Sequence, residues 1–382
     1  LNKSNYLPFV TIQIPVYNDP VVERCIKSCL NLNYPKSKYE IIVIDDSTDE
    51  NTRKIIDKFK GKIKILRRNN RKGFKAGALN YALKYSKGEI IVIFDADWKV
   101  PKNFLKEIVK YFEDKKVALV QAKQNFLNKS LNSISKFAAN LQLIHYNLIL
   151  KFFNFFGIAF GGGTAMAVRK SALLKVGKWN ENNLTEDADL SIKLLSHGYK
   201  TIYISDLEAK GEVPVKLMHF LRQQRRWTFG VTRSIIENLR LFLFSNFLNK
   251  VQKIILMLPI IFYFFSFITF ISFVSSLIAW LTGSPKPLSI EDIHRFFTVF
   301  ALTSGFIVAS IIISKKEKIA NPFEITFLCL TYGVLTAINN TMYFIKALVT
   351  DKYYWFKTPK KGNVDVIKKH YGKNASKVYE NV

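Results

Sequence analysis

Two aspartates spaced two residues apart, Asp95 and Asp97, have the clearest chemical potential in this chain. They follow the apolar run of residues 90–94, which is typical of a buried strand. Past a strand end, this spacing can turn both carboxylates toward one point. Two hard oxygen ligands at the carboxyl edge of a sheet suit Mg²⁺ or Mn²⁺ bound to a diphosphate. A lone Asp-x-Asp is more often an acidic turn, so the interpretation depends on the rest of the chain.

The aspartate pair needs a sheet to hold it, and the sequence pattern predicts one. Strand patterns occur at residues 9–14, 39–44, 62–66, 90–94, 117–121, 165–168 and 200–204. Helical patterns lie between most of them, and this alternation predicts a parallel sheet with helices on both faces. The polar residues that follow strand ends are Tyr17, Asp19, Asp46, Asp95 and Asp97. Three acidic strand ends indicate a nucleotide site, although a structural role in loops would also explain them.

Two later motifs could carry chemistry. Thr185-Glu186-Asp187 precedes a helical pattern at residues 188–196; Thr185 is suited to cap this helix, and acids are favoured in its first turn. Capping alone could therefore explain the motif. A long helical pattern at residues 215–244 holds the run Gln223-Gln224-Arg225-Arg226-Trp227. An arginine beside a tryptophan is typical of anchoring at a membrane interface, and arginine also binds diphosphate.

The charge of the chain restricts its partners. It has 57 Lys and Arg against 29 Asp and Glu, a formal net charge of +28. No zinc-finger spacing, RNA-binding signature or bundle of short basic helices is present, so we expect no nucleic-acid partner. A membrane face or an anionic substrate remains as the explanation. The five histidines are scattered, which predicts no histidine-based metal site.

Apolar stretches in the last third of the chain predict a membrane region. Residues 254–281 contain no Asp, Glu, Lys, Arg or His and exceed the length that crosses a hydrocarbon core of about 30 Å. Residues 296–314 form a second predicted span, and Lys315-Lys316-Glu317-Lys318 follows it. The positive-inside rule places this basic end and the aspartate-bearing region in the cytosol. Residues 323–349 are also long enough to cross, but a basic tail follows, so we expect an interfacial or re-entrant helix there.

In this order, the motifs resemble those of membrane-bound family-2 glycosyltransferases of the cellulose synthase, hyaluronan synthase and glucomannan synthase type. The resemblance covers roughly residues 8–245. Pro15-Val16-Tyr17-Asn18-Asp19 is similar to the first nucleotide loop, in which the family more often has glutamate at the position of Asp19. Asp45-Asp46 resembles the acidic pair that recognises the base, and Lys75-Ala76-Gly77-Ala78-Leu79-Asn80 the phosphate- and ribose-side motif. Asp95-Ala96-Asp97, Thr185-Glu186-Asp187 and the run from Gln223 to Trp227 resemble the D-x-D, T-E-D and Q-x-x-R-W motifs.

The resemblance implies an inverting transfer of a sugar from a nucleoside-diphosphate sugar, by family precedent a UDP-sugar, with Mg²⁺ or Mn²⁺ as cofactor. It implies catalytic roles for Asp187 as base, Glu186 and Arg226. It implies metal binding by Asp95 and Asp97. The donor-binding residues that it implies are Pro15, Tyr17, Asp19, Asp45, Asp46, Lys75, Gly77, Asp95, Gln223, Arg226 and Trp227.

The expected fold class is α/β: a Rossmann-like GT-A domain followed by amphipathic interface helices and C-terminal transmembrane helices. We expect a cytosolic catalytic domain at residues 1–213, whose helix at about 131–156 packs on the sheet or lies at the membrane interface. Residues 214–250 form an amphipathic helix, and 251–349 form the membrane region of a multi-pass protein of the cell membrane. Residues 350–382 form a basic tail in which Trp355-Phe356-Lys357-Thr358-Pro359-Lys360 resembles a gating loop.

Three functions remain open at this point. The first is a synthase that extends a polysaccharide or oligosaccharide. The second is an enzyme that adds one sugar to a lipid acceptor, which two spans without a full channel would suit. The third is a sugar- or lipid-binding membrane protein whose site has decayed, and the acidic residues Asp46, Asp95, Asp97 and Asp187 argue against it. The expected partners are therefore a nucleotide-sugar donor, a lipid bilayer and a glycan or lipid acceptor.

Overall fold

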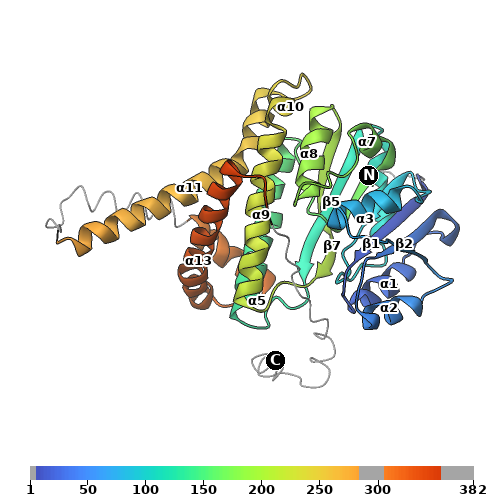
Figure 1. Cartoon of the computed structure of the whole chain (residues 1–382), viewed down its shortest axis with the longest axis horizontal. Helices are drawn as coiled ribbons and strands as arrows, with labels where there is room; N and C mark the ends of the chain where they lie inside the picture. The colour runs from blue at the N-terminus through green and yellow to red at the C-terminus, as the bar shows by residue number, and fades with distance from the viewer. Residues whose placement is uncertain (1–5, 284–304, 354–382) are drawn as a thin grey trace.

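A computed structural model of the chain describes residues 6–283 and 305–353. Its centre is a seven-stranded sheet in the order β3-β2-β1-β4-β6-β5-β7 (Figure 1). The strands are β1 (Val10–Val16), β2 (Tyr39–Asp45), β3 (Lys64–Arg67), β4 (Ile90–Ile93), β5 (Val117–Phe126), β6 (Met166–Arg169) and β7 (Lys200–Gly211). Every strand position predicted from the sequence is occupied by a strand.

The expectation of a fully parallel sheet is wrong in one place. The pairs β1–β2, β2–β3, β1–β4 and β5–β7 are parallel, but β6 lies antiparallel between β4 and β5. The glycine-rich segment that precedes β6 returns the chain to the edge of the sheet where β4 ends, so β6 runs back in the opposite direction. This reversal brings residues 161–164 beside the aspartate pair.

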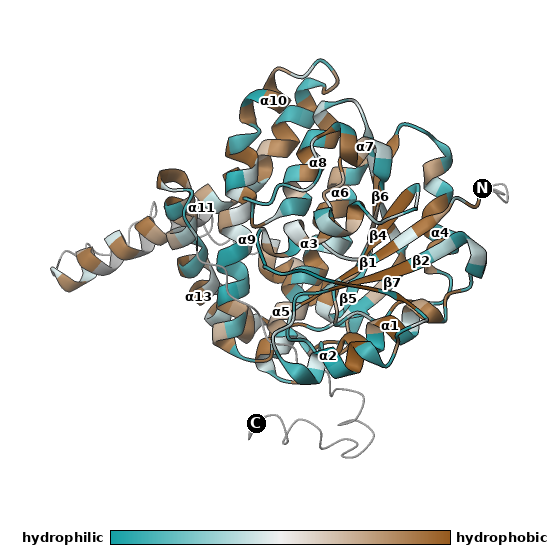
Figure 2. Ribbon diagram, turned by 45° about the vertical axis from the view of Figure 1, so that its right-hand side comes forward, coloured by the Kyte–Doolittle hydropathy of each residue, from teal (hydrophilic) through white to brown (hydrophobic). Residues whose placement is uncertain are grey.

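Helices cover both faces of the sheet, as the alternation predicts. One face holds α1 (Val22–Leu30), α2 (Glu50–Asp57) and α4 (Phe104–Ile108), which bury side chains such as Ile26, Ile56 and Phe104. The other holds α3 (Phe74–Leu83), α7 (Lys170–Lys175) and α8 (Glu186–Ser196). Figure 2 shows the hydrophobic strands between these two layers. The fully buried Ile and Val side chains of β1, β2 and β4 explain why these strands sit at the centre.

The predicted helix at residues 131–156 is present but contains an irregular turn. It consists of α5 (Ser133–Ile144), a π-helical segment at His145–Ile149 and α6 (Leu150–Phe155). Its apolar residues pack against α9 (Leu217–Glu237), α8 and the strand β7. The helix therefore lies on the protein body, while Phe152 and Phe155 remain exposed to the outside.

The C-terminal helices have two different orientations. After α9 and α10 (Leu239–Leu243), the helix α11 (Lys250–Leu281) extends away from the body (Figure 1). Residues 305–317 are helical, and α13 (Pro322–Val349) then runs alongside α9. By length and composition α13 could cross a membrane, and it is the one such helix among those whose residues are all described; several side chains of α11 lie outside the described part of the chain. The remainder of the predicted second span, residues 296–304, and the predicted gating loop lie outside the described residues.

Candidate active site

Lys75 joins the motifs that the sequence places far apart. Its Nζ lies 2.8 Å from Asp95 Oδ1 and 3.4 Å from Glu186 Oε1. It also donates a hydrogen bond of 2.7 Å to the carbonyl oxygen of Gly163. Burial alone would lower the pKa of Lys75, but the carboxylates of Asp95 and Glu186 outweigh it and raise this pKa above its usual value. The lysine is therefore a fixed positive charge between the end of β4 and the start of α8.

The glycine loop at residues 161–163 closes over this charge. A Cβ built on Gly163 would lie 3.1 Å from Lys75 Nζ and 3.3 Å from Asp187 Oδ2. A Cβ on Gly162 would meet the Tyr146 hydroxyl at 2.4 Å. Thr164, next in the chain, accepts the backbone N–H of Asp95 on its Oγ1 at 3.0 Å. The glycines therefore allow the loop to lie directly on the site.

The carboxyl group of Asp187 has properties suited to a base. Burial, and after it the negative charge of Glu186, raise the pKa of this carboxyl group to about 7. Lys75, the backbone N–H of Ala188 and Arg226 act in the opposite direction. A carboxyl group with a pKa near neutral can accept a proton at neutral pH, where about half of the molecules carry it in its ionised form.

The two expected metal ligands lie in different surroundings. The Asp95 side chain is 38% exposed beside Lys75. The Asp97 side chain is buried, and its Oδ2 accepts the backbone N–H of Glu212 at 3.0 Å. Among residues 6–283 and 305–353, no group of three or more His, Cys, Asp or Glu side chains could hold a metal by itself. Because Mg²⁺ in nucleotide sites takes one or two carboxylates together with phosphates and water, the accessible Asp95 fits a metal shared with a diphosphate.

The acidic pair at the end of β2 is held by two arginines. Asp45 is fully buried and accepts bonds from the Ser47 backbone N–H at 3.0 Å and from Arg67 Nε at 2.9 Å. Asp46 accepts Arg68 Nε at 2.8 Å and a second bond from Arg68 Nη2. Asp45 therefore fixes the loop that follows β2. Arg68 lies beside Asp46, so a nucleobase bound at Asp46 would also contact Arg68.

Other predicted donor residues lie around this pair. The guanidinium carbon of Arg71 lies 3.4 Å from the centre of the Tyr17 ring. Pro15 pairs in register with Ile44 of β2. Asp19 is buried just before α1.

Gly77 has a packing role, because a Cβ there would lie 2.1 Å from the carbonyl oxygen of Lys72. Its small size allows the basic loop at residues 67–73 to fold against α3.

The predicted Gln-x-x-Arg-Trp run lies on α9, beside the turn that carries Asp187. Arg226 Nη1 donates to the carbonyl oxygen of Leu184 at 3.2 Å, and its charge acts on Asp187. Gln223 is buried, and no hydrogen-bond partner of its Oε1 occurs among the described residues. Trp227 is half-buried on the same helix. Arg225 points to α13 instead, where its Nε donates to Asn339 Oδ1 at 2.6 Å.

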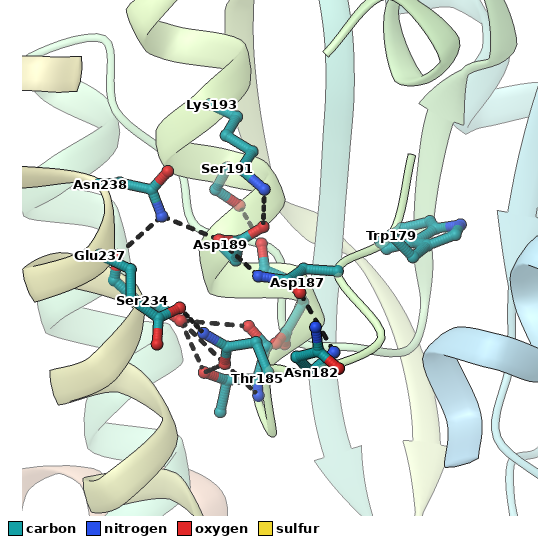
Figure 3. A network of polar contacts seen from close by, with 12 residues as sticks. Trp179, Asn182, Thr185, Asp187, Asp189, Ser191, Lys193, Ser234, Glu237 and Asn238 are labelled. Carbon is teal, nitrogen blue, oxygen red and sulfur yellow. Dashed lines mark hydrogen bonds and ion pairs between the residues drawn. The ribbon is translucent and has the colours of Figure 1, made fainter. Parts of the chain in front are cut away.

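The expected capping role of Thr185 is wrong. Thr185 precedes α8, but its side chain makes no capping hydrogen bond. Its hydroxyl lies 3.0 Å from Ser234 Oγ on α9 and 3.2 Å from Asn183 Oδ1 (Figure 3). A partner located 49 residues later in the chain takes this hydroxyl, and sequence patterns near Thr185 give no sign of it.

Sequence reasoning also missed Arg68 and Arg71. Both belong to the basic loop at residues 67–73, and nothing in their spacing along the sequence connects them to Asp46 and Tyr17. The sequence reasoning had proposed Glu186 as catalytic, and the structure adds that it contacts Lys75. Among the predicted residues, the contacts bring together Asp95, Lys75, Glu186, Asp187 and Arg226 at one region of the sheet edge.

Comparison with known proteins identifies the family and the fold that this chain resembles. Residues 11–177 match the sequence model of the family described as glycosyl transferase family 2. "Glucomannan 4-beta-mannosyltransferase 7" of Arabidopsis thaliana is 33% identical over 239 residues, which cover 58% of this chain and 42% of that protein. "Probable glucomannan 4-beta-mannosyltransferase 15" of the same plant is 32% identical over 270 residues, covering 65% and 50%. The chain thus spans half or less of the length of these relatives.

A solved structure shows the same fold. The mannosyltransferase PcManGT from Pyrobaculum calidifontis, solved in complex with GDP-Man and Mn²⁺, superposes with a TM-score of 0.57. The match covers 91% of this chain and 88% of that one at 19% sequence identity. The family resemblance predicted from the motifs is confirmed. This chain therefore contains a glycosyltransferase family 2 domain with the GT-A fold, homologous to the glucomannan mannosyltransferases.

Proposed function

We propose that the chain is a metal-dependent inverting hexosyltransferase that extends a polysaccharide or oligosaccharide at the cytosolic face of a membrane. The observation that carries the proposal is the meeting of Asp95, Lys75, Glu186 and Asp187 at one edge of the sheet. One member of this group is an accessible carboxylate, one is a fixed cation, and one is a carboxyl group whose pKa is raised to about 7.

The proposed roles follow from these charges. Asp187 takes the proton of the acceptor hydroxyl as this oxygen attacks the anomeric carbon. Lys75 and Arg226 lie where they stabilise the negative charge that develops on the departing nucleoside diphosphate. Asp95, with Asp97 behind it, would hold Mg²⁺ or Mn²⁺, which would supply further charge neutralisation at the diphosphate. A single base without a covalent carboxylate nucleophile gives inversion at the anomeric carbon.

The donor is a nucleoside-diphosphate hexose. Tyr17, Asp46 and the arginines at 68 and 71 form the side of the site where we place the nucleobase. Family precedent favours UDP, whereas the relatives are named as mannosyltransferases. We therefore propose a mannosyl or glucosyl donor. The screen described below identifies its nucleobase.

The membrane placement rests on two helices. Most of the described side chains of α11 that are exposed are large and apolar, among them Ile254, Phe262, Ile278 and Trp280. We propose that α11 crosses the bilayer. The helix α13 lies along α9 and turns an apolar stripe outward at Phe323, Phe327, Leu330, Val334, Met342, Ile345 and Val349. Such a stripe suits a helix that lies in the membrane interface, so we propose that α13 does not cross.

The test is a nucleotide-release screen with the detergent-solubilised chain, UDP- and GDP-sugars, and Mn²⁺ or Mg²⁺. The expected result is release of one nucleoside diphosphate that depends on the sugar, on the metal and on Asp187. Product length then separates the two acceptor classes. A ladder of products supports the polymer-extending function, whereas one lipid-soluble product would support single transfer to a lipid. Absence of release with every donor would refute the proposal.

A further inference from the structure

A buried polar cluster connects α9 to the turn that carries the proposed base. Its centre is Asn183 Oδ1, which accepts the Thr185 backbone N–H at 2.9 Å, the Thr185 hydroxyl at 3.2 Å and the Ser234 hydroxyl at 3.2 Å. Ser234 Oγ also lies 3.0 Å from Thr185 Oγ1. Figure 3 shows Ser234 and Thr185 facing each other across the gap between the two helices. The side chains of Asn183, Thr185 and Ser234 thus contact one another.

The cluster is sealed from solvent. The exposed fraction of the residue is 0% for Ser234, 5% for Thr185 and 8% for Asn183. Around it, Asn183 Nδ2 donates to Glu237 Oε2 at 3.3 Å, and Asn238 Nδ2 donates to Asp189 Oδ1 at 2.8 Å. A buried network whose members are satisfied fixes a geometry more strictly than apolar packing does, because its bonds are directional.

Close packing of α9 against the same turn supports this role. A Cβ on Gly230 would lie 2.7 Å from Thr185 Cγ2 and 3.1 Å from the Thr185 backbone nitrogen. Arg226, one helical turn earlier, holds the carbonyl oxygen of Leu184. Three residues on successive turns of α9 therefore contact the segment at residues 183–187: Arg226, Gly230 and Ser234.

The helix α8 lacks a common stabilising interaction, the capping hydrogen bond of the threonine that precedes it. A threonine before a helix normally accepts an N–H of the first turn, a bond worth about 1 kcal/mol. Thr185 makes no such bond, because its hydroxyl is committed to Ser234 and Asn183. A contribution to the stability of α8 therefore does not explain why the Thr185 hydroxyl bonds to Ser234 and Asn183. The placement of the next two residues, Glu186 and Asp187, explains it.

We propose that Ser234 and Asn183 are positioning residues, which hold the turn before α8 so that the Asp187 carboxylate faces Lys75 and the glycine loop. The inference rests on the proposed function, in which Asp187 is the base. Neither residue touches the reacting atoms. They act through Thr185 and the backbone of the turn, and a displacement of a base by about 1 Å costs a factor on the order of 100 in rate.

The chain offers a matched control for Ser234. Thr232 lies two residues earlier on α9, is equally buried, and its hydroxyl has no hydrogen-bond partner among the described residues. Ser234→Ala and Thr232→Val each remove one buried hydroxyl from the same helix. Only the first removes a contact to the turn, so a general effect of altering α9 would appear in both variants.

The experiment measures kcat, the KM for the donor and the thermal unfolding midpoint of the full chain in detergent, with the donor that the screen selects. We expect Ser234→Ala to lower kcat at least tenfold, with the donor KM within twofold of wild type and an unfolding midpoint close to that of Thr232→Val. Asn183→Ala should have a similar effect, and the double variant should be little worse than either, because both act through one cluster. Gly230→Ala, which pushes on Thr185 from the other side, should also lower kcat.

Two results would overturn the inference while leaving the proposed function intact. One is a kcat for Ser234→Ala within twofold of that for Thr232→Val in a preparation whose wild type is active. The other is a loss that appears as a matching rise in the donor KM, which would indicate a donor-binding role. A wild-type chain that releases no nucleoside diphosphate from any donor would instead overturn the proposed function, and this inference with it.

Discussion

Replacement of Lys75 by methionine tests the electrostatic design of the site. Lys75 Nζ and Asp187 Oδ2 lie 3.1 and 3.3 Å from the same point, the Cβ position of Gly163, so their separation is at most about 6.4 Å, the sum of the two. At this distance a unit positive charge stabilises the Asp187 carboxylate by about 2.6 kcal/mol for an effective dielectric constant of about 20, and by about 0.6 kcal/mol in water. Removal of the charge therefore raises the pKa of Asp187 by about half a unit to two units.

The sign of the effect on activity follows from the role of the base. Asp187 must be ionised to accept a proton, so kcat rises as the pH increases through its pKa, which is about 7 in the wild-type chain. Lys75→Met should shift this rise to higher pH by about one unit. Glu186→Gln removes a charge that raises the same pKa and should shift the rise to lower pH. Lys75→Arg keeps the charge and serves as the control.

The assay measures nucleoside-diphosphate release as a function of pH, over the range of about pH 5 to 9. The donor is kept at saturating concentration, so that a loss of donor binding does not affect kcat. The argument would be refuted if the curve of Lys75→Met coincided with that of wild type or moved to lower pH. Movement of both variants in the same direction would also refute it.

Three further predictions concern single interactions. Asp187→Asn should abolish transfer while donor binding, measured by calorimetry, stays within a few fold; retained turnover would exclude Asp187 as base. Removal of divalent cations with a chelator should stop nucleotide release, Mn²⁺ should restore it, and Asp95→Ala should require much more Mn²⁺ for half-maximal activity; an unchanged requirement would show that Asp95 is no ligand. Glu317→Gln should destabilise the chain by up to about 3 kcal/mol near neutral pH, because it leaves the buried ammonium of Lys123, 2.7 Å away, with only the more distant carboxylate of Glu208 at 3.4 Å. Since Lys123 and Lys129 outweigh burial and lower the pKa of Glu317 from 4.5 to about 2, this difference should vanish in unfolding experiments as the pH falls through that range.

The sequence was sufficient to predict the strands and the order of the motifs. Apolar runs such as residues 90–94 and the acids behind them are local signals, and the structure confirms a strand at each predicted position. The lengths were less predictable, because β7 extends to Gly211 through polar residues that pair with β5. The direction of β6 could not be inferred, since a strand of four residues carries no mark of whether it pairs parallel or antiparallel.

The site was predictable where a residue acts by its own chemistry and not where it acts through a partner. Asp95 and Asp187 stand out by type and position. Arg68 and Ser234 do not, because their importance depends on contacts with residues 22 and 49 positions away. The π-helical segment at His145–Ile149 likewise leaves no trace in the apolar pattern, which runs continuously through it.

The position of α9 has a mechanical consequence. On one side it holds the turn of Asp187, and on the other it packs along α13, whose outer apolar stripe would contact acyl chains in the proposed interfacial placement. In that placement, a change in the thickness of the surrounding acyl chains would shift α13 and, through α9, the turn that carries Asp187. Turnover numbers measured in short-chain detergent micelles and in nanodiscs should therefore differ.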